Sequence, residues 1–154
     1  MRIRDFKKGD ETALWNVFYA AIHVTASANY SPEQLDAWAP RQVDPTRWAQ
    51  RMQGIAPFVA EDDNGSIVAY ADLQNSGYID HFFVSPAVGR RGVGSLLMER
   101  IHEKAFSIGL SALFSEVSLS AQPFFEKWGF ATEELKSVSI RGISLKNCRM
   151  RKML

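Results

Sequence analysis

A chain of 154 residues is long enough to bury the core of one domain, and we expect a single domain over residues 1–154. Hydrophobic residues at 46% and charged residues at 23% disfavour both intrinsic disorder and a membrane-spanning chain. The net charge of +1 disfavours nucleic acid as a partner, and one cysteine, Cys148, excludes an internal disulfide and suits a reducing compartment. The segment from Met1 to Lys8 is too charged for a signal peptide. We therefore expect a cytoplasmic protein without a membrane partner.

The N-terminal part of the chain predicts a short strand around Ile3 followed by a long helix. Asp10 is expected to cap this helix, which begins at Glu11 and ends near Ala28. Helical spacing predicts a buried stripe on it made of Leu14, Val17, Phe18, Ala21 and Thr25. Two shorter helices are predicted next, because the caps Ser31 and Asp44 are each followed by a proline that suits the first helical position.

Three β-rich runs follow from residue 55. The first two are joined by Asp63-Asn64-Gly65, a hairpin signal because Asn-Gly tolerates positive φ, and the third covers residues 77–84. We expect these runs to form a three-stranded antiparallel meander. A helix then begins after Gly92 and ends at the C-cap residue Gly109, with a predicted buried stripe of Val93, Leu97, Ile101, Ala105 and Ile108.

The last third of the chain predicts a strand over residues 110–119, a short helix that ends at Gly129, and two strands that turn near Arg141-Gly142. The predicted order is β-α-α-β-β-β-α-β-α-β-β. We expect an α/β (α+β) fold, with a mixed, mostly antiparallel sheet of about seven strands and helices on both faces.

The segment from Val84 to Ile101 places a glycine-rich corner before a helix. It lacks the lysine of a phosphate-binding P-loop, and Leu97 stands where a dinucleotide-binding motif needs its third small residue. The remaining pattern, Gly89-x-x-Gly92-x-Gly94, would present free amides and the positive end of the helix dipole to an anion. From these residues alone, an ordinary strand-to-helix turn explains the corner equally well.

Together these segments resemble the GNAT (Gcn5-related) N-acetyltransferases over essentially the whole chain. The likeness rests on the element order, on "FFVSP" before the glycine-rich loop, and on the late "FFEKWGF" helix-turn. The chain is more closely similar to the YafP-like branch, through "TASANYSPEQLDAWAP", "YIDHFFV" and "SIRGISLKNCRM". The resemblance implies an acetyl-CoA-dependent transferase that acetylates an amine, and no metal cofactor.

The resemblance also implies how acetyl-CoA would be held. Phe82, Phe83 and Val84 would hydrogen-bond the pantetheine and the acetyl carbonyl through a splayed strand. The pyrophosphate would bind the amides of the loop and first helical turn, contributed by Arg90, Arg91, Gly92, Val93, Gly94 and Ser95. Two positions depart from the family pattern: Gly89 replaces a Gln or Arg, and Phe125 replaces a tyrosine that protonates the leaving thiolate in many members. Phe125 is expected at the acetyl-CoA site.

Acetyl transfer to an amine calls for a general base, and three residues are candidates. Glu116 falls where some family members have a catalytic glutamate, although a solvent-facing strand carboxylate would look the same. Asp80 and His81 lie on the splayed strand, and we expect His81 to titrate near neutrality. Polar residues on an alternating strand more often form only its solvent-facing side, and this alternative stays open for both.

The acceptor wall is expected in the helical region, at Tyr30 through its hydroxyl and at Trp38 and His23, although aromatic residues at this spacing also suit a core. His102 is expected on an exposed helix face, and the three histidines lack metal-ligand spacing. We expect the acceptor to be a small-molecule or protein amine, and the protein to be a monomer or homodimer. The alternative function is a non-catalytic acyl-CoA-binding sensor, which the missing tyrosine makes worth considering.

Overall fold

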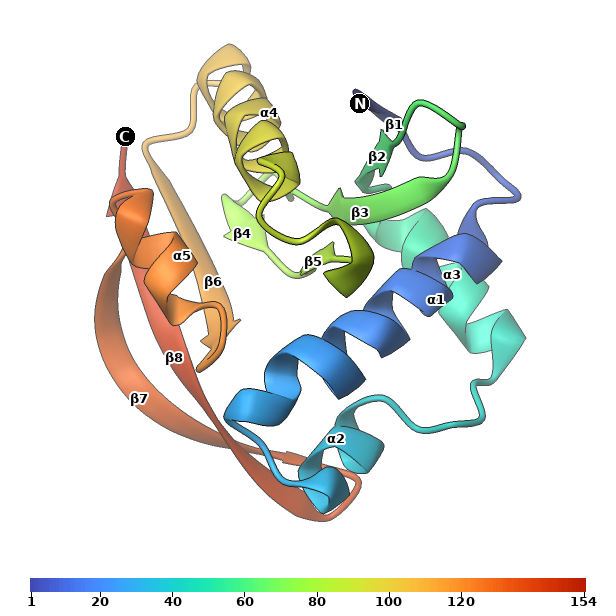
Figure 1. Ribbon diagram of the computed structural model, residues 1–154. Coiled ribbons are helices and arrows are strands. Elements are labelled where there is room, and N and C mark those ends of the chain that lie inside the picture. The colour runs from blue at the N-terminus through green and yellow to red at the C-terminus, as the bar shows by residue number, and fades with distance from the viewer.

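The computed structural model describes all 154 residues, and its eight strands form two four-stranded sheets (Figure 1). The first sheet is antiparallel, with the order β1 (Arg2–Asp5), β2 (Phe58–Glu61), β3 (Ile67–Ala71) and β5 (Phe82–Val84). The second has the order β4 (Tyr78–Ile79), β6 (Ala112–Ser118), β8 (Ile143–Met153) and β7 (Ala131–Ile140). Only β4 and β6 pair in parallel. The mixed, mostly antiparallel fold is confirmed. In place of the expected single sheet of about seven strands, the protein has eight strands in two sheets of four.

Five α-helices lie around these sheets: α1 (Glu11–Ala20), α2 (Pro32–Trp38), α3 (Pro45–Ile55), α4 (Val93–Ser107) and α5 (Gln122–Lys127). The first sheet is buried on both faces because helices pack against each of them, and its alternating side chains enter two different cores. Phe58, Ala69 and Ala71 lie in the core with the buried stripe of α4. Val59 and Tyr70 lie in a second core with α1 and α3. The expected order of elements is confirmed with two differences from the order written out above. Three helices precede β2, as the caps Ser31 and Asp44 predict, and the third β-rich run forms two strands, β4 and β5.

The helix starts and hairpin turns confirm most of the local predictions. Ser31 and Asp44 cap α2 and α3 with their side chains, and Gly109 follows α4 with φ at 73°. The β2–β3 hairpin turns at Gly65 with φ at 78°. The β7–β8 hairpin turns at Arg141 and Gly142, whose φ values are 48° and 78°.

Three local predictions were wrong. Asp10 does not cap α1 with its side chain, because its carboxylate binds the Arg4 guanidinium at 2.8 and 3.0 Å. Beyond α1 the helix continues as a π-helical turn over Ala21–Thr25, which shifts the buried stripe by one residue, so Thr25 is exposed. Ile108 is 44% exposed because α4 ends at Ser107 and Ile108 lies past the packed stripe.

No helix is both long and apolar enough to cross a membrane. Cys148 is completely buried in the core around α4, as expected for a packing residue.

Candidate active site

The site is built where the third β-rich run breaks between the two sheets. The expected strand over residues 77–84 is in fact two: β4 pairs with β6 in the second sheet, and β5 pairs with β3 in the first. The chain changes sheets at Asp80 and His81. Because β4 ends at Ile79, opposite Ser115, the rest of β6 has no partner on that side. The free edges of β5 and β6 therefore diverge and open a gap between the sheets.

A buried carboxylate stabilises this break. Asp72 is completely buried, and its Oδ1 accepts hydrogen bonds from the backbone amides of Asp80 at 2.8 Å and His81 at 2.7 Å. Burial raises the pKa of Asp72 to about 6, although the amide of His81 opposes the shift. Ser115 adds a second link, because its hydroxyl donates to the Ile79 carbonyl at 2.7 Å. The sequence analysis missed both residues, and no local motif marks them.

The glycine-rich corner lies at one end of the gap. Its backbone is left-handed at Arg90, with φ at 64°, and at Gly92, with φ at 81°. Gly92 caps α4 without a side-chain hydrogen bond, and none of the amides from Arg90 to Ser95 donates a hydrogen bond within the protein. Six consecutive free amides at the N-terminus of a fifteen-residue helix can donate hydrogen bonds to an anion.

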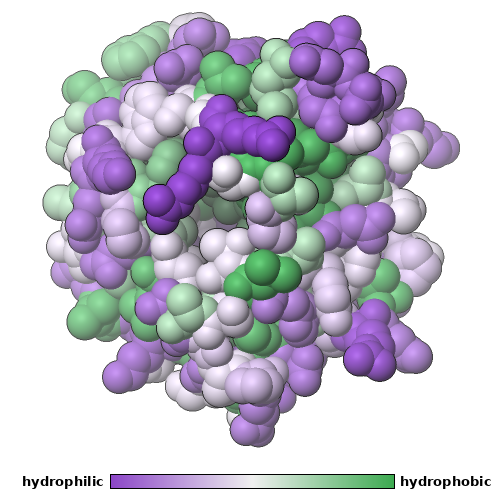
Figure 2. Space-filling model, viewed as in Figure 1, coloured by the Kyte–Doolittle hydropathy of each residue, from purple (hydrophilic) through white to green (hydrophobic).

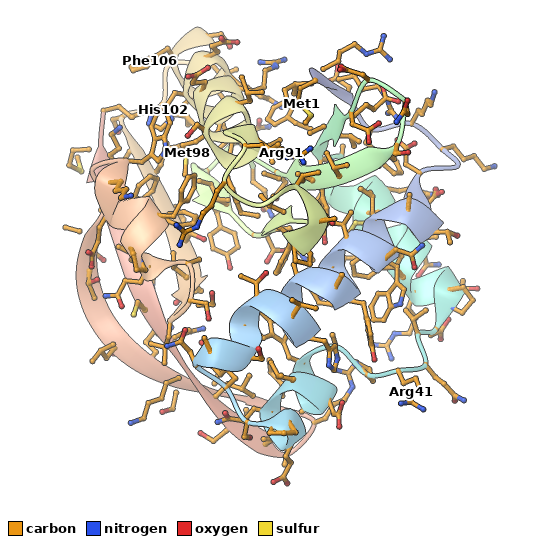
Figure 3. The ribbon with its side chains drawn as sticks, in the orientation of Figure 1. Met1, Arg41, Arg91, Met98, His102 and Phe106 are labelled. Atoms are coloured by element: carbon orange, nitrogen blue, oxygen red, sulfur yellow. The ribbon has the colours of Figure 1, made fainter.

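The N-terminus of α4 packs directly beside β5 and α5. A Cβ at Gly94 would lie 3.3 Å from the Phe124 ring and 3.9 Å from the Phe82 ring, so glycine permits this approach. Figure 3 shows the Arg91 side chain extending from the loop toward α5, across the front of the gap. Arg91 can therefore add a charged donor to the amides of the loop.

A cavity of about 640 Å³ occupies the gap and continues toward the helical region. Figure 2 shows this face hollowed near its centre, with hydrophilic and hydrophobic residues around the hollow. The predicted site residues that line the cavity are Tyr30, Trp38, Asp80, His81, Phe82, Phe83, Glu116 and Phe125. His23 does not line it: its Nε2 lies 2.7 Å from the Ala39 carbonyl and its ring stacks on Tyr19.

Glu116 lies on β6 where that strand has lost its neighbour. Its Oε1 forms ion pairs with Lys136 Nζ at 3.4 Å and Arg149 Nε at 3.8 Å. Its Oε2 is buried and has no hydrogen-bond partner. The carboxylate is thus held by two cations through Oε1, while Oε2 has no hydrogen-bond partner within the protein.

The other two candidate bases differ from Glu116. Asp80 forms an ion pair with Arg51 at 3.5 Å. His81 is only 3% exposed and is packed among aromatic rings, with Nδ1 3.0 Å from the Tyr70 hydroxyl. Burial, together with the charge of Arg51, lowers the pKa of His81 to about 3. The expectation that His81 titrates near neutrality on a polar strand face was therefore wrong.

The hydroxyl of Tyr30 is already bound within the protein. It donates to the Lys146 carbonyl at 2.5 Å and accepts from the Leu119 amide at 3.0 Å, so it joins the segment before α2 to β8 and to the end of β6. Its ring lines the cavity beside Trp38. The hydroxyl has a structural role that the sequence analysis did not foresee.

Phe125 lines the cavity, whereas His102 lies outside it. Phe125 is 2% exposed, and its ring, which carries no hydroxyl, packs against Phe82 and Phe130. His102 is half-buried between Trp128 and Lys152, with Nε2 2.9 Å from Lys152 Nζ, which corrects its expected exposure. No group of three or more His, Cys, Asp or Glu side chains is arranged to bind a metal ion.

The family model described as an acetyltransferase (GNAT) domain matches residues 26–153, which includes every strand that borders the gap. The chain belongs to the GNAT acetyltransferase family. This GNAT acetyltransferase is 34% identical to the uncharacterized N-acetyltransferase YafP of Escherichia coli K12 over 151 residues, 98% of this chain and 95% of YafP. The expected likeness to the YafP branch is confirmed.

Solved structures of other GNAT proteins share the fold. A GCN5-related N-acetyltransferase from Rhodopseudomonas palustris, also named as a class-II aminotransferase, superposes with a TM-score of 0.94 at 31% identity, covering 99% of this chain and 95% of that one. A phosphinothricin acetyltransferase from Sinorhizobium meliloti, in complex with acetyl-CoA, superposes with a TM-score of 0.73 at 18% identity, covering 99% and 88%. At that identity the second likeness concerns the fold of the GNAT acetyltransferase alone.

Proposed function

We propose that this acetyltransferase moves an acetyl group from acetyl-CoA to a primary amine of a small molecule or protein, by direct attack of the amine on the thioester. The observation that carries the proposal is the run of six free amides from Arg90 to Ser95 next to the cavity that Glu116 lines. None of these six residues, nor Val84, lines the cavity itself, but Gly94 lies against Phe82, which does. The amides suit a pyrophosphate, and the cavity has room for the reacting groups. The acetyl-CoA bound in the Sinorhizobium meliloti relative supports this choice of donor.

The free edge of β5 is the proposed site for the pantetheine arm. Phe82, Phe83 and Val84 pair with β3 on one side only, so their outward backbone groups can bind amides of the arm. The missing neighbour on the other side is the consequence of the break at Asp80 and His81. Acetyl-CoA would thus take the place of a strand between β5 and β6, and it supplies the thioester.

Glu116 is the proposed general base. An alkyl ammonium with a pKa of about 10.4 is neutral in roughly one molecule per thousand at pH 7, so removal of its proton limits the attack. The Glu116 side chain is 23% exposed and lines the cavity, so its carboxylate can accept this proton directly or through a water. Lys136 and Arg149 hold the carboxylate in position through Oε1. His81 remains neutral at this pH because its pKa is lowered to about 3, so its proposed part is a hydrogen bond from the cavity wall.

The leaving thiolate needs no acid at Phe125. A thiol like that of cysteine has a pKa of about 8.5, so its thiolate is an adequate leaving group. The buried Phe125 ring instead packs against Phe82 on the strand proposed to bind pantetheine. Asp80 is proposed to orient Arg51 at the acceptor side of the cavity.

A panel of amines assayed for CoA thiol release tests the proposal. We expect turnover with at least one primary amine, and loss of that turnover in Glu116→Gln. Tight acetyl-CoA binding by calorimetry without turnover of any amine would favour the non-catalytic sensor, for which the lack of a hydroxyl at Phe125 is the supporting observation. No binding of acetyl-CoA would refute both functions.

A further inference from the structure

The charged residues that line the cavity fall into two groups with different partners. The acidic members are Asp44, Asp80 and Glu116, and the basic members are Arg47, Arg51, Arg141 and Lys146. The acceptor must bring a protonated amine into this cavity, so the charges that remain unpaired decide which amines are favoured. The ion pairs and hydrogen bonds of each group determine which of these charges remain unpaired.

Every carboxylate of the cavity already has a partner. Asp44 accepts hydrogen bonds from the amides of Thr46 and Arg47 at 3.0 and 3.2 Å as the cap of α3. Asp80 is paired with Arg51, and Glu116 is paired with Lys136 and Arg149 through Oε1. The cavity therefore offers no free acidic side chain for a second ammonium group of the acceptor.

The remaining cations have no acidic partner. Arg47 on α3 and Lys146 on β8 form no ion pair, and Arg141 donates only to the Ala37 carbonyl, at 2.6 Å. Arg47 stands on the helical wall and the other two on the β7–β8 hairpin, so unpaired positive charge borders the cavity from both sides. A polyamine or aminoglycoside would meet like charge there, whereas an anionic group would be attracted.

The surface between these cations is aromatic. Trp38 packs edge-on against Phe83, and Trp48 packs edge-on against Trp15, all four lining the cavity. Such rings favour an apolar body and provide no carboxylate. The acceptor that fits is an amine with a compact apolar body and one anionic group.

From these contacts we infer that the acceptor is a small primary amine that also carries a carboxylate or phosphate, bound through Arg47 and Lys146. The inference rests on the proposed acetyltransferase function and deepens it by naming the substrate class. Arg47 can hold either oxyanion with two parallel hydrogen bonds, and Lys146 adds a point charge. Both side chains are accessible to water, so their attraction is screened by salt.

Matched amines that differ only in the anionic group test the inference. The carboxylate arm compares L-phenylalanine with phenethylamine and L-leucine with isoamylamine, and the phosphate arm compares phosphoethanolamine with ethanolamine; spermidine is the polycationic probe. We expect kcat/KM to favour the anionic member of at least one arm by about tenfold at low salt, through KM, and the preference to shrink at high salt. Which arm shows the preference identifies the oxyanion.

Variants test whether Arg47 and Lys146 cause the preference for anionic amines. Arg47→Ala combined with Lys146→Ala is expected to abolish it. Arg41→Ala is the matched control, because Arg41 is exposed, lies outside the cavity and points away from it in Figure 3. Equal kcat/KM within every pair, a preference for spermidine, or a preference that survives in the double variant would overturn the inference while leaving the proposed function standing.

If no amine is turned over, the binding of N-acetylated compounds tests the inference instead. Calorimetry with CoA present compares N-acetyl-L-phenylalanine with N-acetylphenethylamine. Tighter binding of the anionic compound, lost in the double variant, would support the anion site although the proposed reaction had failed. Equal or absent binding of both compounds would overturn it.

Discussion

The Asp72 carboxylate accepts the backbone amide of His81 at 2.7 Å, at the point where the chain passes from one sheet to the other. The same oxygen also binds the amide of Asp80. The gap between β5 and β6 exists because the strand is interrupted here and its two parts join different sheets. The buried Asp72 carboxylate therefore stabilises the interruption that opens the site.

This contact predicts an unusual pH dependence of stability. Native Asp72 keeps its proton up to its raised pKa of about 6, whereas the unfolded chain releases it near the ordinary value of 3.8. The native state binds more protons between these values, so the contribution of Asp72 to stability is present below about pH 4 and is lost as pH rises through 6. Two pKa units correspond to about 3 kcal/mol.

Replacing Asp72 with Asn tests this prediction by denaturant unfolding at several pH values. We expect the free energy of unfolding of Asp72→Asn, relative to the original protein, to rise by up to about 3 kcal/mol between pH 4 and pH 7. The exposed Asp36→Asn on α2 serves as the control and should show no such trend. A flat difference for Asp72→Asn would show that its pKa is not raised.

Tyr30→Phe is predicted to destabilise the protein without weakening acceptor binding. It leaves the Lys146 carbonyl and the Leu119 amide without their shared partner, which costs about 1–3 kcal/mol. Thermal unfolding measures the loss. Tyr19→Phe is the matched control, because Tyr19 stacks on His23 and its hydroxyl makes no hydrogen bond within the protein. A raised KM with unchanged stability would instead restore the substrate contact expected from the sequence.

Gly92→Val is predicted to abolish or strongly weaken CoA binding while the fold persists. Gly92 has φ at 81°, and a Cβ there would touch nothing within 4 Å, so the damage comes from moving the backbone and its amides. Calorimetry should show at least a roughly tenfold loss of affinity, with an unchanged circular dichroism spectrum. Gly54→Ala, on α3 in open space, should bind CoA normally. Unchanged affinity in Gly92→Val would remove this loop from the site.

Arg91→Ala should weaken CoA binding less than Gly92→Val does. Its guanidinium is an exposed charge beside the free amides, so its contribution depends on ionic strength. CoA titrations at low and high salt should show a difference of several-fold that largely disappears at high salt. A difference that does not change with salt would mean that Arg91 makes a specific, desolvated contact.

Glu116→Gln is predicted to lower kcat by about 10²–10⁴ while acetyl-CoA affinity changes little. The defect should be largest well below the pKa of the amine and should shrink at high pH, where the free base is abundant. Glu134→Gln, an exposed change on β7, is the matched control. No inflection from His81 is expected near neutrality, because its pKa is about 3. A Glu116→Gln rate equal to that of the original protein at pH 7 would exclude this carboxylate as the base.

Phe125→Tyr should raise the activity of the original protein only slightly. The ring is buried, so a new hydroxyl would need a hydrogen-bond partner there. Thiol-release rates of this variant and the original protein test the point directly. A gain of tenfold or more would show that protonation of the leaving group limits the reaction.

Local chemistry in the sequence was sufficient for the elements and for the glycine-rich loop. The caps Ser31 and Asp44, the turn at Gly65 and the helix that begins after Gly92 each depend on residues within one turn of the chain. A capping side chain or a left-handed glycine acts the same way whatever surrounds it. The free amides before α4 follow from the same local rule.

Only the tertiary structure decided what the polar residues of the site do. His81 and Asp80 are adjacent in sequence, yet packing buries one among aromatic rings and leaves the other paired with Arg51. Glu116 is oriented by Lys136 and Arg149, from two other strands. Burial and the charges of distant segments determine the pKa of His81 and which oxygen of Glu116 is paired. Neither property can be inferred from the residues next to His81 or Glu116 in the sequence.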